Sequence, residues 1–585
     1  MSFFPSVNSF LEAPVAVWTG TWKRASARAR WAAVLLSLML GSAQMIGSRI
    51  AADGSLGVST AGHAAILCAE ILLASACFAL LFVPVLSAAG RWEGWTGTTA
   101  PRGLWNASPA KRILVIAGIL VVCWSVYWFV LWPGTVTNDS FNQLEQAMGQ
   151  RWLSDHHPLL NTLIIKAILV PVYGLVGNYS VAISAVTAVQ LVVLAGIYAA
   201  SINALRGFSP PRGLLNIIIA FFALSPLFGW YSVTIWKDVW LTAFVLALAS
   251  AGAVIVQRLR AGARPGAVLW TTFMIVALGV MFSKKTGIYL MVPMVLVVVC
   301  FLGAHAWKAR AKWLAIGLLP VVLYLLAQPL LLDLTNAAPG STREMFSVPS
   351  QQISRVVRDD PKSLSAEQRE SIARFYSGKN LGALYDPHLA DPVKNALDTE
   401  ALNSDLSGYL LLWAKLGAEH PKAYLESFLE GTVGYWYPNV SYWKVNSADW
   451  VAKANQFHAN ELKDPSHGPG MSEEFLSQIP SDRTTNEGYR RVLSAEVDNR
   501  LPDIPVIGWT LKLGAWTWAV LICAAIAFVR RRVIAIPVLV LEAFVWVSCL
   551  ISPVFAEARY AIPMLAMLPL LAVLAGTRAE EEPQR

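Results

Sequence analysis

One stretch of the sequence gathers acidic, basic and amide side chains directly after a long apolar run. The residues "TNDSFNQLEQAMGQRWLSDHHP" span 137–158 and follow the run that ends in "FVLWPG". A carboxylate at such a position can accept the proton of an attacking hydroxyl group, which is general-base catalysis. Asp139 is best placed for this role because it lies just beyond the Pro133–Gly134 turn. Its structural alternative is to cap the helix that "NDSF" could begin.

Three more side chains in this stretch, Asp155, His156 and His157, could support the same chemistry. Histidine and carboxylate side chains can also hold a metal, but this stretch has no His-x-x-x-His or comparable ligand spacing. Hydrogen bonding to a substrate, or fixing the loop ahead of Pro158, is therefore the favoured role. No cofactor is assigned, and a divalent metal held with Asp139 or Asp155 stays open as an alternative.

Basic residues recur in three short segments, "SVTIWKDVW", "MFSKKTGIY" and "SPVFAEARYAIP", that end or begin apolar runs. Lysine and arginine hold phosphate through charge-assisted hydrogen bonds, so these segments predict an anionic substrate, a phosphate or pyrophosphate on a long lipid. The alternative for any single lysine is that its amine reaches out to the membrane interface. The expected phosphate-binding residues are Lys237, Lys284, Lys285, Arg559 and Tyr560, and the expected supporting residues are Asp238 and Glu557.

The composition identifies a membrane protein. Of the 585 residues 56% are apolar and only 14% are charged, with a mean hydropathy of +0.50, whereas soluble proteins carry about 25% charged residues. The net charge of +9 lies in short clusters between apolar runs, as in cytoplasmic loops, so no nucleic-acid partner is expected. All six cysteines lie inside apolar runs, which excludes a disulfide framework or a cysteine metal site in the polar segments.

About thirteen apolar runs have a length near that of a membrane span. If the run at 159–175 does not cross, every basic cluster falls on one face and the positive-inside rule holds throughout. Pro158, Lys166, Pro171 and Gly174 interrupt that run, so we expect it to form an interfacial helix at the outer face. The predicted fold is an all-α polytopic membrane protein with about twelve transmembrane helices and both termini in the cytoplasm.

This topology divides the chain into five regions. They are an N-terminal cytoplasmic segment with three spans (1–132), a first outer loop with the acid and the interfacial helix (133–177), central spans (178–333), an extracytoplasmic helical segment (334–505), and C-terminal spans with a cytoplasmic tail (506–585). The aromatic stretch "GTVGYWYPNVSYW" (431–443) suits either a sugar or lipid-phosphate surface or an aromatic belt at the interface. No internal repeat of the kind found in many transporters stands out.

The order of span, acidic loop, interfacial helix, further spans and a late "EARYAIP" resembles the GT-C superfamily of polytopic glycosyltransferases. That superfamily includes protein mannosyltransferases and the lipid A aminoarabinose transferase. The segments "WPGTVTNDSFNQ", "DHHPLLNT", "WKD", "SVPSQQISRVV", "DPVK" and "GYWYP" resemble more closely a family of bacterial membrane proteins without assigned function, usually grouped with GT-C enzymes. This closer likeness covers most of the chain after about residue 112.

The resemblance implies roles for particular residues. Asp139 matches the aspartate that serves as catalytic base or metal-coordinating acid, and Arg559 in "RY" matches a position near the donor phosphate. We also expect Gln351 and Gln352 of "SVPSQQISRVV" to support the substrate site. Many GT-C members carry two acids where "NDS" has one, which leaves both the second acid and the metal requirement open.

Together these features predict a GT-C-type glycosyltransferase of the cell membrane, with its active site on the extracytoplasmic side. The expected donor is a polyprenyl-phosphate-linked sugar, and the expected acceptor is a hydroxyl group of a cell-envelope glycan, lipid or protein. Membrane lipids are expected to surround the protein. The alternatives are a transporter or flippase, or a polymerase or ligase, of lipid-linked saccharides. A transporter would need ionisable groups deep within the spans, and the apolar runs hold few of them.

Overall fold

The computed structural model describes residues 18–95, 103–301, 307–441, 454, 468–478, 508–552 and 554–578. Parts of the expected N-terminal region, of the 334–505 segment and of the C-terminal tail therefore lie outside the described residues. The same holds for Tyr442 and Trp443, the last two aromatic residues of the 431–443 stretch.

Every apolar run found in the sequence forms a helix or a pair of helices. The described residues contain no strand, only three isolated β-bridges. The apolar helices are α2 (Ala27–Asp53), α3 (Ala61–Arg91), α4 (Pro109–Val130), α6 (Leu159–Val176), α7 (Tyr179–Leu205), α8 (Arg212–Leu224), α9 (Pro226–Ser232), α10 (Lys237–Arg260), α11 (Ala267–Ser283), α12 (Gly287–Phe301), α13 (Trp307–Thr335), α24 (Leu513–Val529), α25 (Ile536–Leu550) and α26 (Ala558–Ala575).

The chain is an all-α polytopic membrane protein. Among the described residues, nine helices are long and apolar enough to cross a membrane, or ten if α8 and α9 form one span. The axis between α8 and α9 bends by 53°, because Pro226 cannot donate a backbone hydrogen bond and disfavours helical geometry at Ser225. Helices α11, α12 and α24 are apolar but shorter. The count of about twelve spans stays a prediction.

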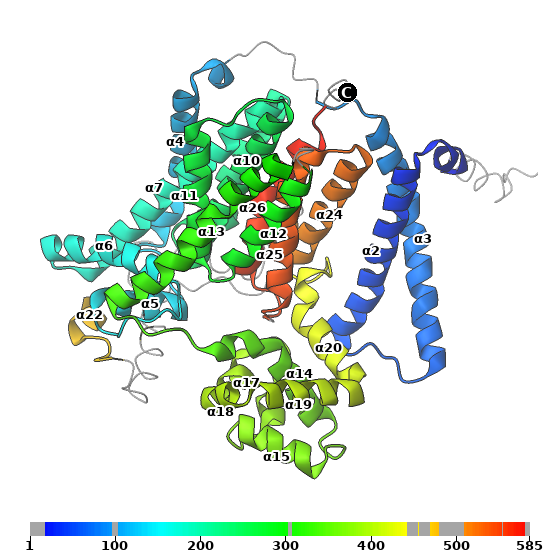
Figure 1. The fold of residues 1–585 in the computed structure, drawn as a ribbon, viewed down its shortest axis with the longest axis vertical. Coiled ribbons are helices and arrows are strands. Elements are labelled where there is room, and N and C mark those ends of the chain that lie inside the picture. Colours follow the sequence, from blue (N-terminus) through cyan, green and yellow to red (C-terminus); the bar gives the residue numbers. More distant parts are fainter. Residues whose placement is uncertain are drawn as a thin grey trace, which may run out of the picture.

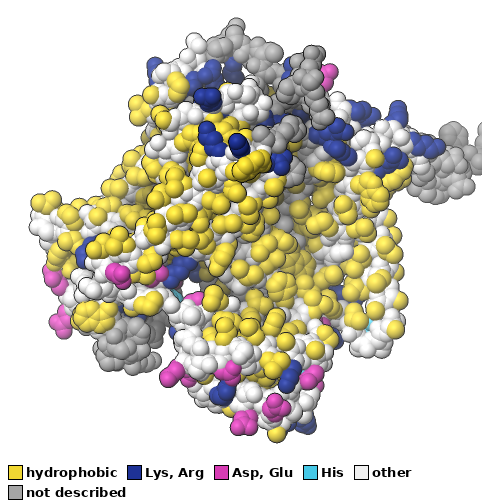
Figure 2. Space-filling model, viewed as in Figure 1, with side chains coloured by type: hydrophobic (Ala, Val, Ile, Leu, Met, Phe, Trp, Pro, Cys, Tyr) yellow, Lys and Arg dark blue, Asp and Glu magenta, His cyan; other side chains and the backbone are white. Residues whose placement is uncertain are grey.

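The two ends of the bundle differ in charge. Figure 2 shows Lys and Arg side chains gathered at the top, a broad apolar band below them, and acidic side chains around the lobe at the bottom. Two adjoining cavities at the top, which we call the basic end, bring together arginines from six segments of the chain. These are Arg28, Arg112, Arg206, Arg258, Arg260, Arg530, Arg531, Arg532 and Arg578.

The connection between α4 and α7 stays at the other end of the bundle. Arg112 near the start of α4 and Arg206 just after α7 line one cavity, so both helices have these ends at the basic end. Residues 131–178, including α6, therefore join their opposite ends. In Figure 1 the helix labelled α6 runs across the view, whereas α2 and α3 run along it. By length and composition α6 is still one of the nine candidate spans, so the expectation that the 159–175 run does not cross stays a prediction.

A helical lobe lies at the end opposite the basic end (Figure 1). It comprises α14 (Ser347–Asp359), α15 (Ala366–Phe375), α16 (Leu381–Leu384), α17 (Asp391–Ala396), α18 (Thr399–Ser404), α19 (Leu406–Glu419) and α20 (Pro421–Thr432). The lobe has its own apolar core around Ile353, Phe375 and Tyr409, as expected of a segment that buries apolar area without help from the bundle.

A buried arginine ties this lobe to the loop between α2 and α3. Arg355, 4% exposed, pairs with Glu426 at 3.1 Å and Glu430 at 2.5 Å, and donates to the carbonyl of Gly54 at 2.8 Å. Glu426 in turn accepts from the backbone amide of Leu56 at 2.9 Å. The α2–α3 loop therefore lies at the same end as the lobe.

Candidate functional site

Asp139 lies at the end of the bundle opposite the basic end, on a segment that is fixed to the start of α10. The backbone of Thr135 exchanges hydrogen bonds with Val233 and Ile235 at 3.0 and 3.1 Å. Gly134 permits this close approach, because its φ is 132° and a Cβ there would meet the Val233 carbonyl at 2.8 Å. The first loop therefore reaches α10 at the residues just before Lys237.

The helix α5 (Asn138–Met148) begins with a capping box that leaves Asp139 free for other contacts. The Thr137 hydroxyl accepts from the Ser140 amide, and the Ser140 hydroxyl accepts from the Thr137 amide at 2.9 Å. The Ser140 hydroxyl also donates to the Ile235 carbonyl at 2.7 Å. Thr137 is therefore the N-cap, and the structural alternative for Asp139 is wrong. Asp139 lies in the first turn, where a carboxylate is favoured by the helix dipole.

The start of α26 brings Arg559 to the same place. The Glu557 side chain caps α26 by accepting from the Arg559 amide. The Tyr435 hydroxyl donates to the Val554 carbonyl at 2.8 Å and accepts from the Glu557 amide at 3.1 Å. The guanidinium carbon of Arg559 lies 4.9 Å from the ring centroid of Trp236, within the range of a cation–π contact.

Asp139 forms the centre of a charged cluster. Its Oδ2 accepts from Arg559 at 2.7 Å and lies 3.7 Å from the Lys237 amine. The Lys237 amine also lies 2.9 Å from Nδ1 of His157, so this histidine nitrogen accepts if the lysine is protonated. The Asp139 side chain is 26% exposed, which leaves it open to a ligand from one side.

The surrounding charges decide the protonation states in this cluster. Burial alone would raise the pKa of Asp139, but the neighbouring cations, Arg559 above all, outweigh burial and hold that pKa well below its usual range. Burial, followed by Lys237, lowers the pKa of His157 well below its usual value. At neutral pH the cluster therefore contains a carboxylate, a neutral imidazole and two cations.

A second group of side chains lies beside this cluster. The Lys284 amine is 4.7 Å from the ring centroid of Tyr560, and the Tyr560 hydroxyl accepts from Arg559 at 3.3 Å. Burial lowers the pKa of Lys284, while the charge of Asp238 opposes this shift. Asp238 is 1% exposed, and neither of its carboxylate oxygens has a hydrogen-bond partner among the described residues.

The remaining first-loop residues lie further out. Asp155 pairs with Lys285 at 2.8 Å, and Lys285 is thereby engaged away from Asp139. The ring of His156 packs edge-on against His157 with centroids 4.6 Å apart. The structure thus separates the two adjacent lysines, since Lys284 faces Tyr560 and Lys285 faces the loop.

Gln351 and Gln352 are used inside the lobe. Gln351 donates to the Asp386 carbonyl at 2.6 Å, and Gln352 donates to the Tyr424 carbonyl at 3.2 Å and accepts from the Trp413 indole at 2.8 Å. Both residues thus hold α14 against its neighbours. Their partners give them a packing role in the lobe rather than a place beside Asp139.

The charged cluster does not fit a divalent metal. Within the described ranges, no group of three or more His, Cys, Asp or Glu side chains could hold an ion. Oδ2 of Asp139 is already bonded to Arg559, and a metal cation at this carboxylate would be repelled by Arg559 and Lys237. The donor set instead suits an anion such as phosphate.

Sequence reasoning missed the residues that position this site. Trp236 is 2% exposed and donates to the Thr137 hydroxyl at 2.5 Å, and Tyr435 is 1% exposed and holds the segment before α26. The described part of the 431–443 stretch is thus largely packed inside, rather than forming a sugar surface or an aromatic belt. Tyrosine and tryptophan bury a large apolar ring and still need one polar partner. This property is the only sequence signal that could have indicated that Trp236 and Tyr435 position the site.

The side chains of Asp139, Lys237 and Arg559 are 26%, 17% and 16% exposed, so the cluster is partly accessible. Figure 2 shows an opening between the apolar band and the lobe, with basic, acidic and histidine side chains at its edge. Arg559 and Lys237 can bind an anionic group and stabilise the charge of a leaving phosphate, and the Asp139 carboxylate can accept a proton.

No curated protein and no solved structure matches this chain. One family model matches it over residues 148–585, beginning just after Asp139 and covering the lobe and the α10–α26 part of the site. Since this match covers well over half of the chain, the protein belongs to the family of unknown function DUF6020.

Proposed function

We propose that the protein is a GT-C-type glycosyltransferase that moves a sugar from a polyprenyl-phosphate donor to an acceptor hydroxyl group. The observation that carries this proposal is the Asp139 carboxylate, paired with Arg559 at 2.7 Å and close to Lys237. A carboxylate paired with two cations suits a reaction in which an anionic leaving group and a base act side by side. Glu557, whose carboxylate lies 3.9 Å from Arg559, is a second acid beside the same cation.

The ion pair suggests how donor binding prepares the base. A donor phosphate competes with Asp139 for Arg559 and Lys237, because both anions need the same cations. When the phosphate takes these cations, the Asp139 carboxylate loses the charges that hold its pKa down. It then becomes a better proton acceptor at the moment when the donor is in place.

The transfer step needs no further acid. The acceptor oxygen attacks the anomeric carbon, the bond from that carbon to the phosphate oxygen breaks, and the hydroxyl proton moves to Asp139. The electrons of the broken bond remain on the lipid phosphate, whose charge Arg559, Lys237 and Lys284 stabilise. Trp236 and Tyr435 act as positioning residues, because they fix the segments that carry Asp139 and Arg559.

The charge distribution supports an orientation of this reaction in the membrane. The arginines gathered at the basic end are typical of cytoplasmic loops. The site and the lobe would then face the extracytoplasmic side of the cell membrane, where acceptors of the cell envelope are present.

One observation favours transport of a lipid-linked saccharide as a second candidate. Glu542 on α25 is 1% exposed, and its carboxylate oxygens have no hydrogen-bond partner among the described residues. An ionisable residue buried within a span can mark a proton or substrate path. In a transporter Glu542→Gln would abolish lipid translocation into proteoliposomes, whereas in a transferase it would leave sugar transfer intact.

The proposal is tested by a transfer assay on the purified full-length protein. Radiolabelled polyprenyl-phosphate hexoses are incubated with the protein and with extracts of cell-envelope acceptors, and the label that moves to the acceptor is measured. We expect transfer by the wild type and a loss of at least about 100-fold in Asp139→Asn, the low end for general-base catalysis. Asp155→Asn is the matched control, since this acid lies on the same loop but pairs with Lys285. Equal transfer by both variants would rule out Asp139 as the base.

A further inference from the structure

A large cavity at the basic end lies away from the proposed active site. It has a volume of about 950 Å³ and is bounded by the ends of α10, α24 and α26 and by the start of α25. Six arginines line it: Arg28, Arg260, Arg530, Arg531, Arg532 and Arg578.

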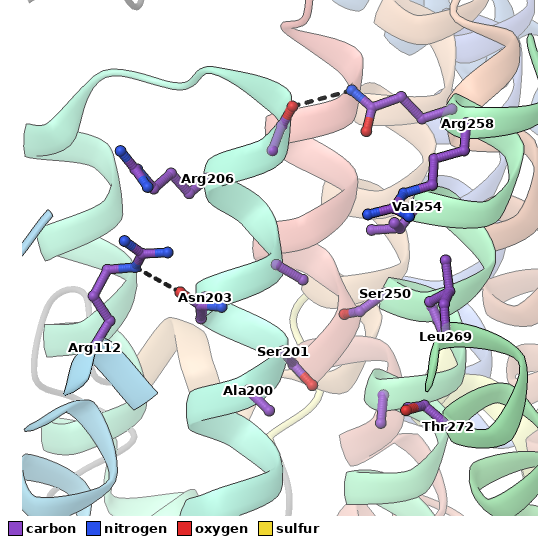
Figure 3. A pocket seen from close by; sticks show the side chains of 15 residues that line it. Arg112, Ala200, Ser201, Asn203, Arg206, Ser250, Val254, Arg258, Leu269 and Thr272 are labelled. Atoms are coloured by element: carbon purple, nitrogen blue, oxygen red, sulfur yellow. Dashed lines mark hydrogen bonds between the residues drawn. The ribbon is translucent and has the colours of Figure 1, made fainter. Parts of the chain in front are cut away.

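A second cavity of about 460 Å³ adjoins the first, since Gly207 and Gln257 line both. Figure 3 shows Arg112 and Arg206 on one side of it and Arg258 on the other. Arg112 donates to the Asn203 side chain at 2.7 Å, and Gln257 donates to the Gly207 carbonyl at 3.0 Å. The two cavities lie next to each other, with the Gln257–Gly207 pair between them, and we refer to them together as the hollow.

Among the described residues, neither lining includes Asp or Glu. Arg260 and Arg532 have partners of their own, so the inferred positive charge of the hollow depends on the other arginines, and above all on Arg530. Arg530 is 7% exposed and donates to the carbonyls of Ala575 at 2.6 Å and Trp92 at 3.0 Å. These neutral partners fix its position but leave its charge in place. Burial and then Arg532 lower the pKa of Arg530 to about 10, so it stays protonated at neutral pH.

The large cavity is also partly apolar. Phe528, Ile534 and Leu539 lie in its lining together with the arginines. Its volume lies in the range of about 300–1,000 Å³ that is usual for small-molecule sites. A ligand that fits both features has a phosphate at one end and a hydrocarbon chain at the other. Basic pockets between helices on the cytoplasmic side commonly hold the headgroups of anionic lipids.

We propose that the cavity at the basic end binds a phosphate-bearing ligand, and that this ligand is the headgroup of an anionic lipid. The arginines would hold the phosphate oxygens through charge-assisted hydrogen bonds, and the apolar wall would receive the start of the chain. This site is separate from the cluster around Asp139 and does not depend on the proposed reaction. A soluble phosphate compound offers the same anion without the chain, so the test must distinguish the two.

The experiment measures binding to the full-length protein in a zwitterionic detergent. Phosphatidic acid is the lipid probe and inorganic pyrophosphate the soluble probe, each measured by titration calorimetry. The test variant combines Arg28→Gln, Arg531→Gln and Arg578→Gln. The control combines Lys308→Gln and Lys312→Gln, which change basic residues near the start of α13 that line neither cavity. The control residues lie at the same end of the bundle as the cavities. Trp313, next to Lys312, stacks on Trp270 of α11 with ring centroids 5.6 Å apart, and Leu269, the neighbour of Trp270, lines the smaller cavity.

We expect the test variant to bind phosphatidic acid at least about tenfold more weakly, as follows from the loss of charged hydrogen bonds, and the control to bind it as the wild type does. An equal loss in both variants would overturn the proposal, because it would reflect only the total positive charge. Tight binding of pyrophosphate without binding of the lipid would overturn the assignment to a lipid.

One part of the chain itself could compete for the cavity. Glu580, Glu581 and Glu582 follow Arg578 in the sequence but lie outside the described residues. A variant with all three changed to Gln should bind phosphatidic acid with an affinity close to that of the wild type. If phosphatidic acid binds only to this variant, the cavity serves the chain's own acidic tail, and the proposal is wrong.

Discussion

The Asp139→Asn variant should bind a polyprenyl phosphate more tightly than the wild type while losing transfer. The reason is the ion pair seen in the structure, in which the carboxylate occupies Arg559 at 2.7 Å and lies 3.7 Å from Lys237. An amide cannot hold these cations by charge, so the donor phosphate no longer has to displace an anion. If Asp139 acted only as a proton acceptor, its replacement by Asn would leave the Kd of the polyprenyl phosphate unchanged. Tighter binding by the variant would therefore indicate that Asp139 and the phosphate compete for the same cations.

The size of the effect follows from the charged hydrogen bond that the phosphate must break. Hydrogen bonds to charged groups contribute about 1.5–3 kcal/mol. Because the Asp139 side chain is 26% exposed, solvent screening favours the lower end of this range. A gain of about 1.4 kcal/mol corresponds to a tenfold lower Kd. We therefore expect the Kd of Asp139→Asn to fall by up to about tenfold.

The assay is equilibrium binding of a radiolabelled short-chain polyprenyl phosphate to the purified protein. Arg559→Gln alone should raise the Kd, and adding Asp139→Asn to it should produce a smaller gain than in the wild type, since the main contested cation is gone. Asp155→Asn is the control and should leave the Kd unchanged, because its partner Lys285 faces the loop. Weaker binding by Asp139→Asn would refute the competition and indicate that the carboxylate positions Arg559 for the donor.

Three further predictions test the site, the orientation and the lobe. Burial lowers the pKa of Lys284, so this lysine should lose its positive charge between neutral pH and about 10.4, the ordinary lysine value. Binding of the polyprenyl phosphate should therefore weaken as the pH rises through this range, and Lys284→Arg should remove the pH dependence. In a variant without native cysteines, Ser363→Cys should react with an impermeant thiol reagent added outside the cell, and Gly207→Cys should not. The opposite result would show that the lobe faces the cytoplasm and that the proposed orientation is wrong. Arg355→Met should lower stability by about 3 kcal/mol, the low end for breaking a buried ion pair, since it leaves the buried Glu426 and the half-buried Glu430 without this cation. A melting temperature close to that of the wild type would contradict this.

The sequence alone predicted the all-α membrane fold, because the forces that produce it act locally. A run of about 20 apolar residues satisfies its backbone hydrogen bonds within itself as a helix. The basic clusters and the broken run at 159–175 were enough to expect Asp139, Lys237, Lys284 and Arg559 at one end of the bundle. The same reasoning placed Gln351 near that end but could not show that it is used inside the lobe.

Only the tertiary structure decided which of these residues meet. Asp139 and Arg559 are 420 positions apart in the chain, and no local pattern links them. The separation of Lys284 from Lys285 depends on the backbone direction at the end of α11, and the capping role of Thr137 leaves Asp139 to face Arg559. Buried positions for Trp236 and Tyr435 likewise arise from packing between helices that are distant in sequence. Charge and hydropathy thus determine at which end a residue lies, whereas the packing of side chains determines its partner.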